Sequence, residues 1–151
     1  MRRFNLRSGQ LERESDRPEF SWHGKRVGDF LGGQRIGATV YELPQDERVW
    51  PYHFHYGVEE WLLVVEGEPE VRTPSEERRL VPGDLVCFPA GAAGAHTVRG
   101  PGRILLISAN HEPSISVYPD SDKLGTRPGS DAHDDTLNFL RADAVDYWDG
   151  E

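Results

Sequence analysis

Short apolar segments separated by turn-forming residues dominate the chain from residue 36 onward. Runs rich in β-branched and aromatic residues, bounded by Gly, Pro and Asp, predict strands. They cover residues 38–43, 49–55, 61–66, 70–73, 79–81, 85–88, 96–98, 104–108 and 115–118. No part of this region keeps a helical period over ten residues. Strands this short and this regularly spaced predict an all-β sandwich or barrel.

The two ends of the chain differ from this central region. Residues 1–35 are polar and mixed in charge, so we predict an N-terminal arm, with one or two short strands, packed on the barrel. The barrel is predicted to span residues 36–118. Residues 119–151 are predicted to be a loop followed by a docking tail. Within this C-terminal region, residues 119–135 are expected to be the loop, without regular structure, and residues 137–140 are expected to form one more strand.

Composition narrows the possible functions. The chain has 151 residues, which suits one domain, and a net charge of -9 disfavours binding to nucleic acid. No run reaches the ~20 apolar residues that span a bilayer, and the basic N-terminus has no apolar segment after it, as a secretory signal would. We therefore expect a cytoplasmic protein. The single cysteine, Cys87, lies in an apolar run and is expected to be buried.

The residues of greatest chemical interest are His53 and His55. In a strand, residues i and i+2 face the same side, so the two imidazoles project together while Phe54 points away. Such a pair can share one metal ion. By itself the H-x-H pattern is a weak signal and favours a surface pair or hydrogen-bonded core histidines, so neighbouring residues must distinguish these from a metal site.

Two glutamates follow the histidines after a possible turn at residues 56–58. A hairpin would bring either Glu59 or Glu60 beside the imidazoles, and alternation leaves the choice open because both faces of the strand at 61–65 are apolar. A strand of this kind is covered on both faces. We expect the barrel interior on one side, and a terminal segment or a second subunit on the other.

The motif spacing resembles that of a small single-domain bacterial cupin. The first cupin motif reads G-x5-H-x-H-x3–4-E-x6-G, and this chain supplies His53, His55, Glu60 and Gly67 at matching positions, with Glu47 where the opening glycine would be. The spacing to Gly67 therefore selects Glu60 over Glu59, which is expected to face away from the site.

The second cupin motif, G-x5-P-x-G-x2-H-x3-N, is matched by Gly83, Pro89 and Gly91. His96 follows after four residues instead of two, and Gly100 stands at the final Asn position. The resemblance covers roughly residues 36–118. It implies an all-β double-stranded β-helix, also called a jelly roll or cupin barrel, with extended N- and C-terminal arms.

Carried over by position, the resemblance implies that His53, His55, Glu60 and His96 bind a divalent transition metal: Zn, Fe, Mn, Ni or Cu. His23, His111 and His133 are expected to be solvated or capping residues. Three hypotheses for function follow. The first is a metal-dependent enzyme (dioxygenase, isomerase or lyase) that acts on a small molecule held in the barrel, and the second is a non-catalytic module that binds or senses a small molecule. The third is a metal-free structural cupin, which the complete ligand set disfavours. The apolar outer faces and long termini favour a homodimer.

Overall fold

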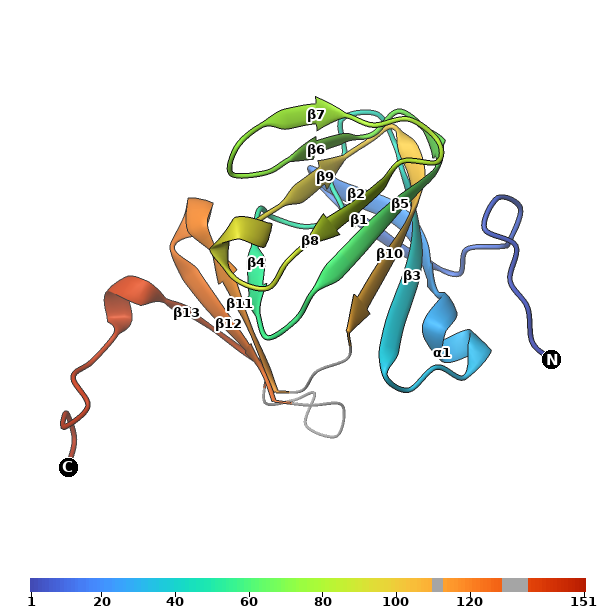
Figure 1. Cartoon of the computed structure of the whole chain (residues 1–151). Coiled ribbons are helices and arrows are strands. Elements are labelled where there is room, and N and C mark those ends of the chain that lie inside the picture. The colour runs from blue at the N-terminus through green and yellow to red at the C-terminus, as the bar shows by residue number, and fades with distance from the viewer. Residues whose placement is uncertain (110–112, 129–135) are drawn as a thin grey trace.

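The structure is a computed structural model, and it describes residues 1–109, 113–128 and 136–151. Most of their regular secondary structure consists of antiparallel strands, which are arranged in three sheets (Figure 1). His111 and His133, for which a solvated or capping role is predicted, lie outside the described residues. None of the helices in the described ranges has the length and apolar character needed to cross a membrane.

The largest sheet has six strands in the order β1-β2-β3-β10-β5-β8. Its strands are β1 (Arg13–Arg17), β2 (Phe20–Arg26), β3 (Ile36–Leu43), β10 (Gly102–Ala109), β5 (Glu60–Gly67) and β8 (Leu85–Phe88). The short helix α1 (Val27–Leu31) connects β2 to β3. Two strands from the first 35 residues therefore extend this sheet, although the predicted division of the chain into arm, barrel and tail stays a prediction.

Two smaller sheets complete the described fold. One has the order β7-β6-β9, with strands β7 (Glu77–Arg79), β6 (Glu70–Arg72) and β9 (Thr97–Arg99). The other has the order β13-β12-β11-β4, with strands β13 (Leu137–Leu140), β12 (Lys123–Arg127), β11 (Ser114–Tyr118) and β4 (Phe54–Tyr56). The connections include the short 3-10 helices η1 (Ala92–Gly94), η2 (Pro119–Ser121) and η4 (Arg141–Asp143).

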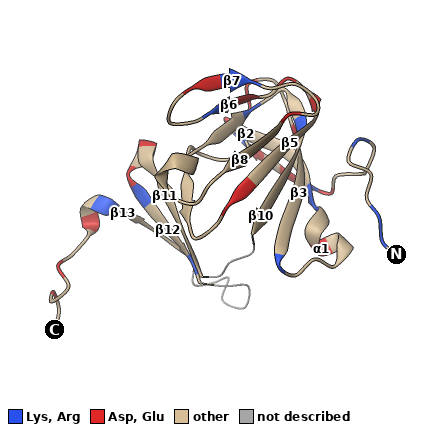
Figure 2. Ribbon diagram, in the orientation of Figure 1, with Lys and Arg blue, Asp and Glu red and all other residues tan. Residues whose placement is uncertain are grey.

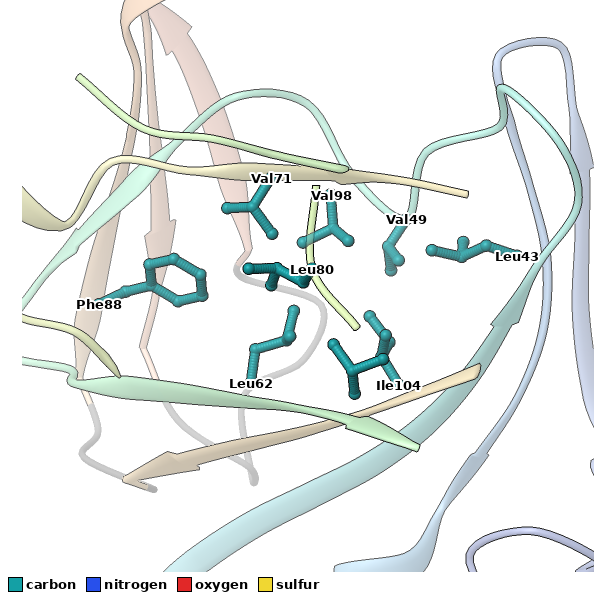
Figure 3. Packing of buried hydrophobic residues seen from close by; sticks show 9 residues of the cluster. Leu43, Val49, Leu62, Val71, Leu80, Phe88, Val98 and Ile104 are labelled. Atoms are coloured by element: carbon teal, nitrogen blue, oxygen red, sulfur yellow. The ribbon is translucent and has the colours of Figure 1, made fainter. Parts of the chain in front are cut away.

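The main core lies between the six-stranded sheet and the β7-β6-β9 sheet (Figure 3). Alternation along β5 explains it, because Leu62 and Val64 point inward and are almost fully buried. They pack with Leu43, Val49, Val71, Leu80, Phe88, Val98 and Ile104. One member of this cluster, Phe88, also stacks on the ring of His96, so the core lies next to this histidine.

A second apolar cluster covers part of the outer face of the same sheet. Val65 and Leu105 pack there with Phe4, Leu6 and Leu11 of the N-terminal segment. The guanidinium of Arg103 holds that segment in place, because it donates to the carbonyl oxygens of Leu6 at 2.7 Å and Gly9 at 2.6 Å. A terminal segment thus provides a cover for the outer apolar face.

Gly67 ends β5 in a conformation that favours glycine, with φ of 83°. A Cβ at this position would also lie 2.6 Å from the Cα of Gly102 in β10. The motif glycine is therefore required by the close approach of two backbones.

Three local predictions were wrong. The expected hairpin does not form among the described strands, because β4 pairs with β11 while β5 pairs with β10 and β8, which places the two strands in different sheets. The expected loop at 119–135 contains η2 and strand β12. Cys87 is exposed because it points away from the interior on β8, an edge strand of the sheet.

Candidate metal centre

Three imidazole rings and one carboxylate converge where the six-stranded sheet meets β4. His55 belongs to β4 and Glu60 opens β5, while His53 and His96 face each other in an isolated antiparallel bridge just outside the strands. The two backbones exchange hydrogen bonds, from His53 N to His96 O at 3.1 Å and from His96 N to His53 O at 2.8 Å. This bridge fixes the two rings relative to each other.

The side-chain atoms at the centre are close enough to share one ion. The Nε2 atoms of His53 and His55 lie 3.0 Å apart, and Glu60 Oε2 lies 3.4 Å from His55 Nε2 and 3.5 Å from His96 Nε2. Ligand atoms of His53, Glu60 and His96 all lie within 4.8 Å of one another. Ligands bound at ~2.0–2.1 Å and at angles near 90–110° are about 2.9–3.4 Å apart, so the separations of 3.0, 3.4 and 3.5 Å are close to those of ligands that share one ion.

The outer nitrogens of the rings orient the inner ones. His53 Nδ1 lies 2.9 Å from the carbonyl oxygen of Pro51, and His96 Nδ1 lies 2.9 Å from that of Gly94. A carbonyl oxygen only accepts, so Nδ1 carries the proton in both rings and Nε2 presents a lone pair to the centre. His55 Nδ1 lies 3.0 Å from the hydroxyl of Ser116 in β11. This is the arrangement by which proteins orient metal-binding histidines.

The centre is buried, and burial shifts the pKa values of two of its histidines. Burial, together with the neighbouring His96 and His55, lowers the pKa of His53 to about 3, and burial also lowers the pKa of His96. Burial acts to raise the pKa of Glu60, but its interactions with His55 first, and with His96 and His53 after it, outweigh burial and lower that pKa. His53 and His96 are therefore neutral at pH 7 and face an ionised carboxylate.

Two of the converging atoms have no hydrogen-bond partner among the described residues. They are Glu60 Oε2 and His96 Nε2, and both are inaccessible to solvent. A buried polar atom without a partner costs about 1–3 kcal/mol, and more when it is charged. A cation at the centre would satisfy both atoms, so the donor set fits a divalent ion.

The longer spacing before His96 is accommodated by η1. The extra residues form this 3-10 turn, which is followed by Ala95 in an extended conformation. Gly94, the last residue of the turn, presents its carbonyl to His96, and a Cβ there would lie 1.8 Å from the carbonyl oxygen of Pro89. The turn therefore packs tightly and orients His96 toward the centre.

Sequence reasoning left the choice between Glu59 and Glu60 to motif spacing. In the structure Glu60 is 7% exposed and faces the histidines. Glu59 lies at the surface, where its carboxylate accepts a hydrogen bond from the indole of Trp61 at 2.7 Å. His23 is distant from these residues in the sequence. It lies in β2, and its largely exposed side chain is near Glu14.

Aromatic rings surround the histidines. The Phe88 ring stacks on His96 with centroids 3.7 Å apart, and Tyr118 stacks on His53 at 5.7 Å. Trp50 packs edge-on against both His53 and His96 at 5.8 Å, and its indole nitrogen is buried without a partner among the described residues. These rings exclude water from the centre.

The sequence analysis did not single out three of the residues around the centre, Phe88, Ser116 and Tyr118. The available signal was weak: in the predicted strand at 115–118, Ser116 and Tyr118 alternate with Ile115 and Val117, which indicates one more polar face. That face turns out to be directed at His55.

Comparisons with known proteins agree with this architecture. Residues 39–108 match the family model described as a cupin domain. A search of curated proteins finds no match. A sugar phosphate isomerase from a cupin superfamily of Silicibacter pomeroyi has a similar fold, with a TM-score of 0.80 and 20% identity over 95% of each chain.

Two further solved structures are more distant in shape. The polyketide cyclase RemF of Streptomyces resistomycificus has a TM-score of 0.54 and 26% identity, over 72% of this chain and 78% of that chain. A protein from Thermus thermophilus has a TM-score of 0.50 and 30% identity, over 66% of this chain and 90% of that chain. Together the domain match and the barrel identify the chain as a small cupin-domain protein.

Proposed function

We propose that the protein binds one divalent transition metal through His53, His55, Glu60 and His96 and acts as a metal-dependent enzyme on a small oxygen-bearing molecule. The observation that carries the proposal is the convergence of three ring nitrogens and one carboxylate oxygen, two of which are buried without a partner among the described residues. Imidazole and carboxylate suit Zn, Fe, Mn, Ni or Cu.

When bound, such an ion acts as a Lewis acid that polarises a carbonyl or hydroxyl oxygen. The protein contributes the remaining features. The carbonyls of Pro51 and Gly94 hold Nδ1 protonated on two rings, so that both Nε2 lone pairs face inward. Glu60 supplies one negative charge, which leaves a divalent site with a net charge of about +1 and a continuing attraction for an anionic oxygen.

Two groups beside the centre can position a substrate. The indole N–H of Trp50 is a donor with no partner in the described structure. The Tyr41 ring packs on Trp50 with centroids 5.6 Å apart, and burial raises the pKa of its hydroxyl, which also hydrogen-bonds with the Thr39 side chain. Donors in a water-excluding site favour oxygen-rich substrates, in line with the sugar phosphate isomerase named among the structural neighbours.

Metal analysis of the purified protein tests the binding step. Wild-type protein is expected to hold close to one ion per chain, and His53→Ala and Glu60→Ala are each expected to lose most of it. His23→Ala is the matched control, because His23 is a histidine exposed on the outer part of the fold. Metal content that stays the same in both site variants would reject the proposal.

A substrate screen tests the catalytic step. Loaded protein is incubated with sugar phosphates, hydroxy acids and aromatic polyols while oxygen consumption and product formation are measured. Turnover that disappears in Glu60→Ala supports an enzyme. Saturable binding without turnover would instead favour the non-catalytic module that binds or senses a small molecule.

A homodimer is also part of this proposal. The outer face of the six-stranded sheet keeps Ile36, Trp61 and Leu85 exposed, and the C-terminal tail keeps Tyr147 and Trp148 exposed. Exposed apolar surface on both features supports association between copies of the chain.

A further inference from the structure

The C-terminal tail carries an exposed aromatic turn. Beyond η4, the side chains of Val145, Tyr147 and Trp148 are 74%, 83% and 71% exposed. The Tyr147 and Trp148 rings pack edge-on with centroids 4.8 Å apart. Large aromatic groups this exposed indicate a surface that binds a partner.

Local hydrogen bonds give this turn a defined shape. The carboxylate of Asp146 accepts from Trp148 N at 3.1 Å, and the carboxylate of Asp149 accepts from Asp146 N at 3.1 Å. The backbone adds a bond from Asp149 N to Asp146 O at 3.1 Å. The two aromatic rings are therefore presented by a pre-organised turn, which lowers the entropic cost of docking.

A groove on the outer face of the six-stranded sheet is lined mostly by apolar residues, which suits the aromatic turn. It has a volume of about 300 Å³ and is lined by Leu6, Arg7, Leu63, Val64, Val65, Pro82 and Gly83. Its apolar wall continues along the sheet to Leu85 and Trp61, which are 56% and 38% exposed. The N-terminal segment covers only one side of this face.

The C-terminal tail and the N-terminal segment beside the groove carry opposite net charges (Figure 2). Residues 141–151 carry four carboxylates and one arginine, whereas residues 1–7 carry three arginines and no acidic residue. Within the described part of the chain, the guanidinium groups of Arg3 and Arg7 enter no ion pair. Opposite charges around an apolar contact favour one orientation of docking.

The tail and the groove of one chain lie apart. Figure 1 places the C-terminal tail and the N-terminal segment at opposite sides of the molecule. The tail leaves from β13, which is the far edge of its sheet. The occupant that fits the groove is therefore the tail of a second copy.

We propose that the turn Asp146–Asp149 of one copy docks into the outer groove of a second copy, with Tyr147 and Trp148 on the apolar wall and the tail carboxylates facing Arg7. In a two-fold dimer each tail would occupy the other copy's groove. Four aromatic side chains bury about 600–1,000 Å² at 150–250 Å² each, so contact between the exposed sheet faces would complete a stable interface. This inference rests on the proposed homodimer and adds its geometry.

Cross-linking through the only cysteine, Cys87, tests the geometry, because this exposed thiol lies on β8 beside Trp61. A Val145→Cys, Cys87→Ser chain is mixed with tagged wild-type chain and treated with a short bis-maleimide. Docking between copies predicts a covalent heterodimer on a denaturing gel. Ser75→Cys in the same Cys87→Ser background is the control, since Ser75 is exposed in the β6–β7 turn, and it is expected to give at least tenfold less product.

Sedimentation equilibrium of the same proteins separates the possible failures. A measured mass of twice the 17.1 kDa of one chain, without a cross-linked product from Val145→Cys, would overturn the docking of the tail and leave the homodimer in place. A mass of one chain would overturn both. As a second test, Tyr147→Ala with Trp148→Ala is expected to weaken the dimer at least tenfold, and Arg7→Glu is expected to weaken it more than Arg35→Glu. An unchanged dissociation constant in both tests would overturn the inference.

Discussion

The hydroxyl of Ser116 lies 3.0 Å from Nδ1 of His55, although the two residues are 61 positions apart in the sequence. The pairing of β11 with β4 brings them together, because Ser116 lies directly opposite His55 in the register. The third imidazole of the candidate metal centre is thus held by a neighbouring strand, whereas the other two are held by carbonyls two residues away.

Replacing Ser116 with Ala should weaken metal binding without unfolding the protein. The substitution removes the partner of His55 Nδ1, and loss of such a partner typically costs about 10–100-fold in metal affinity. Competitive titration with a chromogenic chelator measures the effect. Ser116→Thr keeps the hydroxyl and should retain most of the affinity, and equal affinity in the wild-type and Ser116→Ala proteins would contradict the assigned role.

Acid should destabilise the metal-free protein through His53. Its pKa in the folded chain is about 3 and its ordinary value is 6.5, so between these pH values the unfolded chain binds a proton that the folded chain does not. The stability contributed by the neutral ring is complete above pH 6.5 and is lost as the pH falls toward 3. Its slope is at most about 1.4 kcal/mol per pH unit for one such group.

Urea unfolding of chelator-treated protein at several pH values between 7.5 and 4.5 measures this slope. His53→Gln, which cannot titrate, should show a shallower dependence than the wild type. Parallel curves for the two proteins would contradict the lowered pKa of His53.

Gly94→Ala should disturb both the η1 turn and the metal centre. The new Cβ would lie 1.8 Å from the carbonyl oxygen of Pro89, so the turn must shift and take with it the carbonyl that orients His96. Overpacking of this kind costs about 1–3 kcal/mol. Thermal unfolding and metal content should both fall, while Ala93→Ser, at an exposed position of the same turn, should change neither. Normal metal content in Gly94→Ala would argue against this positioning.

Leu62→Ala should destabilise the barrel by about 2–5 kcal/mol, because Leu62 is completely buried in the main core. The midpoint of urea unfolding measures the change. Leu31→Ala is the control, since Leu31 is 46% exposed in α1 and should cost well under 1 kcal/mol. Similar losses in the two variants would contradict the burial of Leu62 in the main core.

Arg103→Ala should release the N-terminal segment from the sheet. The guanidinium donates to the carbonyls of Leu6 and Gly9 and also pairs with Glu42 at 2.8 Å. Without these bonds, trypsin should cleave after Arg7 several times faster, as mass spectrometry of the fragments would report. Arg35→Ala, at an exposed position, is expected to leave that rate unchanged, and a rate unaffected by Arg103→Ala would contradict the anchoring role.

The sequence by itself determined the features that depend on local spacing. Short β-branched runs between turn residues predicted an all-β barrel, because strand propensity and alternation act over a few residues. The i, i+2 relation placed His53 and His55 on one face, and their Nε2 atoms meet in the structure. Glu60 shares its face of β5 with Leu62 and Val64, and that face became the interior.

The tertiary structure decided everything that depends on which strands pair. No local rule indicates that the chain crosses from one sheet to another between β4 and β5, so the expected hairpin was wrong. The register that sets Ser116 against His55, and the 3-10 turn that aims His96 at Glu60, depend on contacts between distant residues. Sheet pairing is non-local, and its energy comes from burying whole faces, which a pattern of neighbouring residues does not specify.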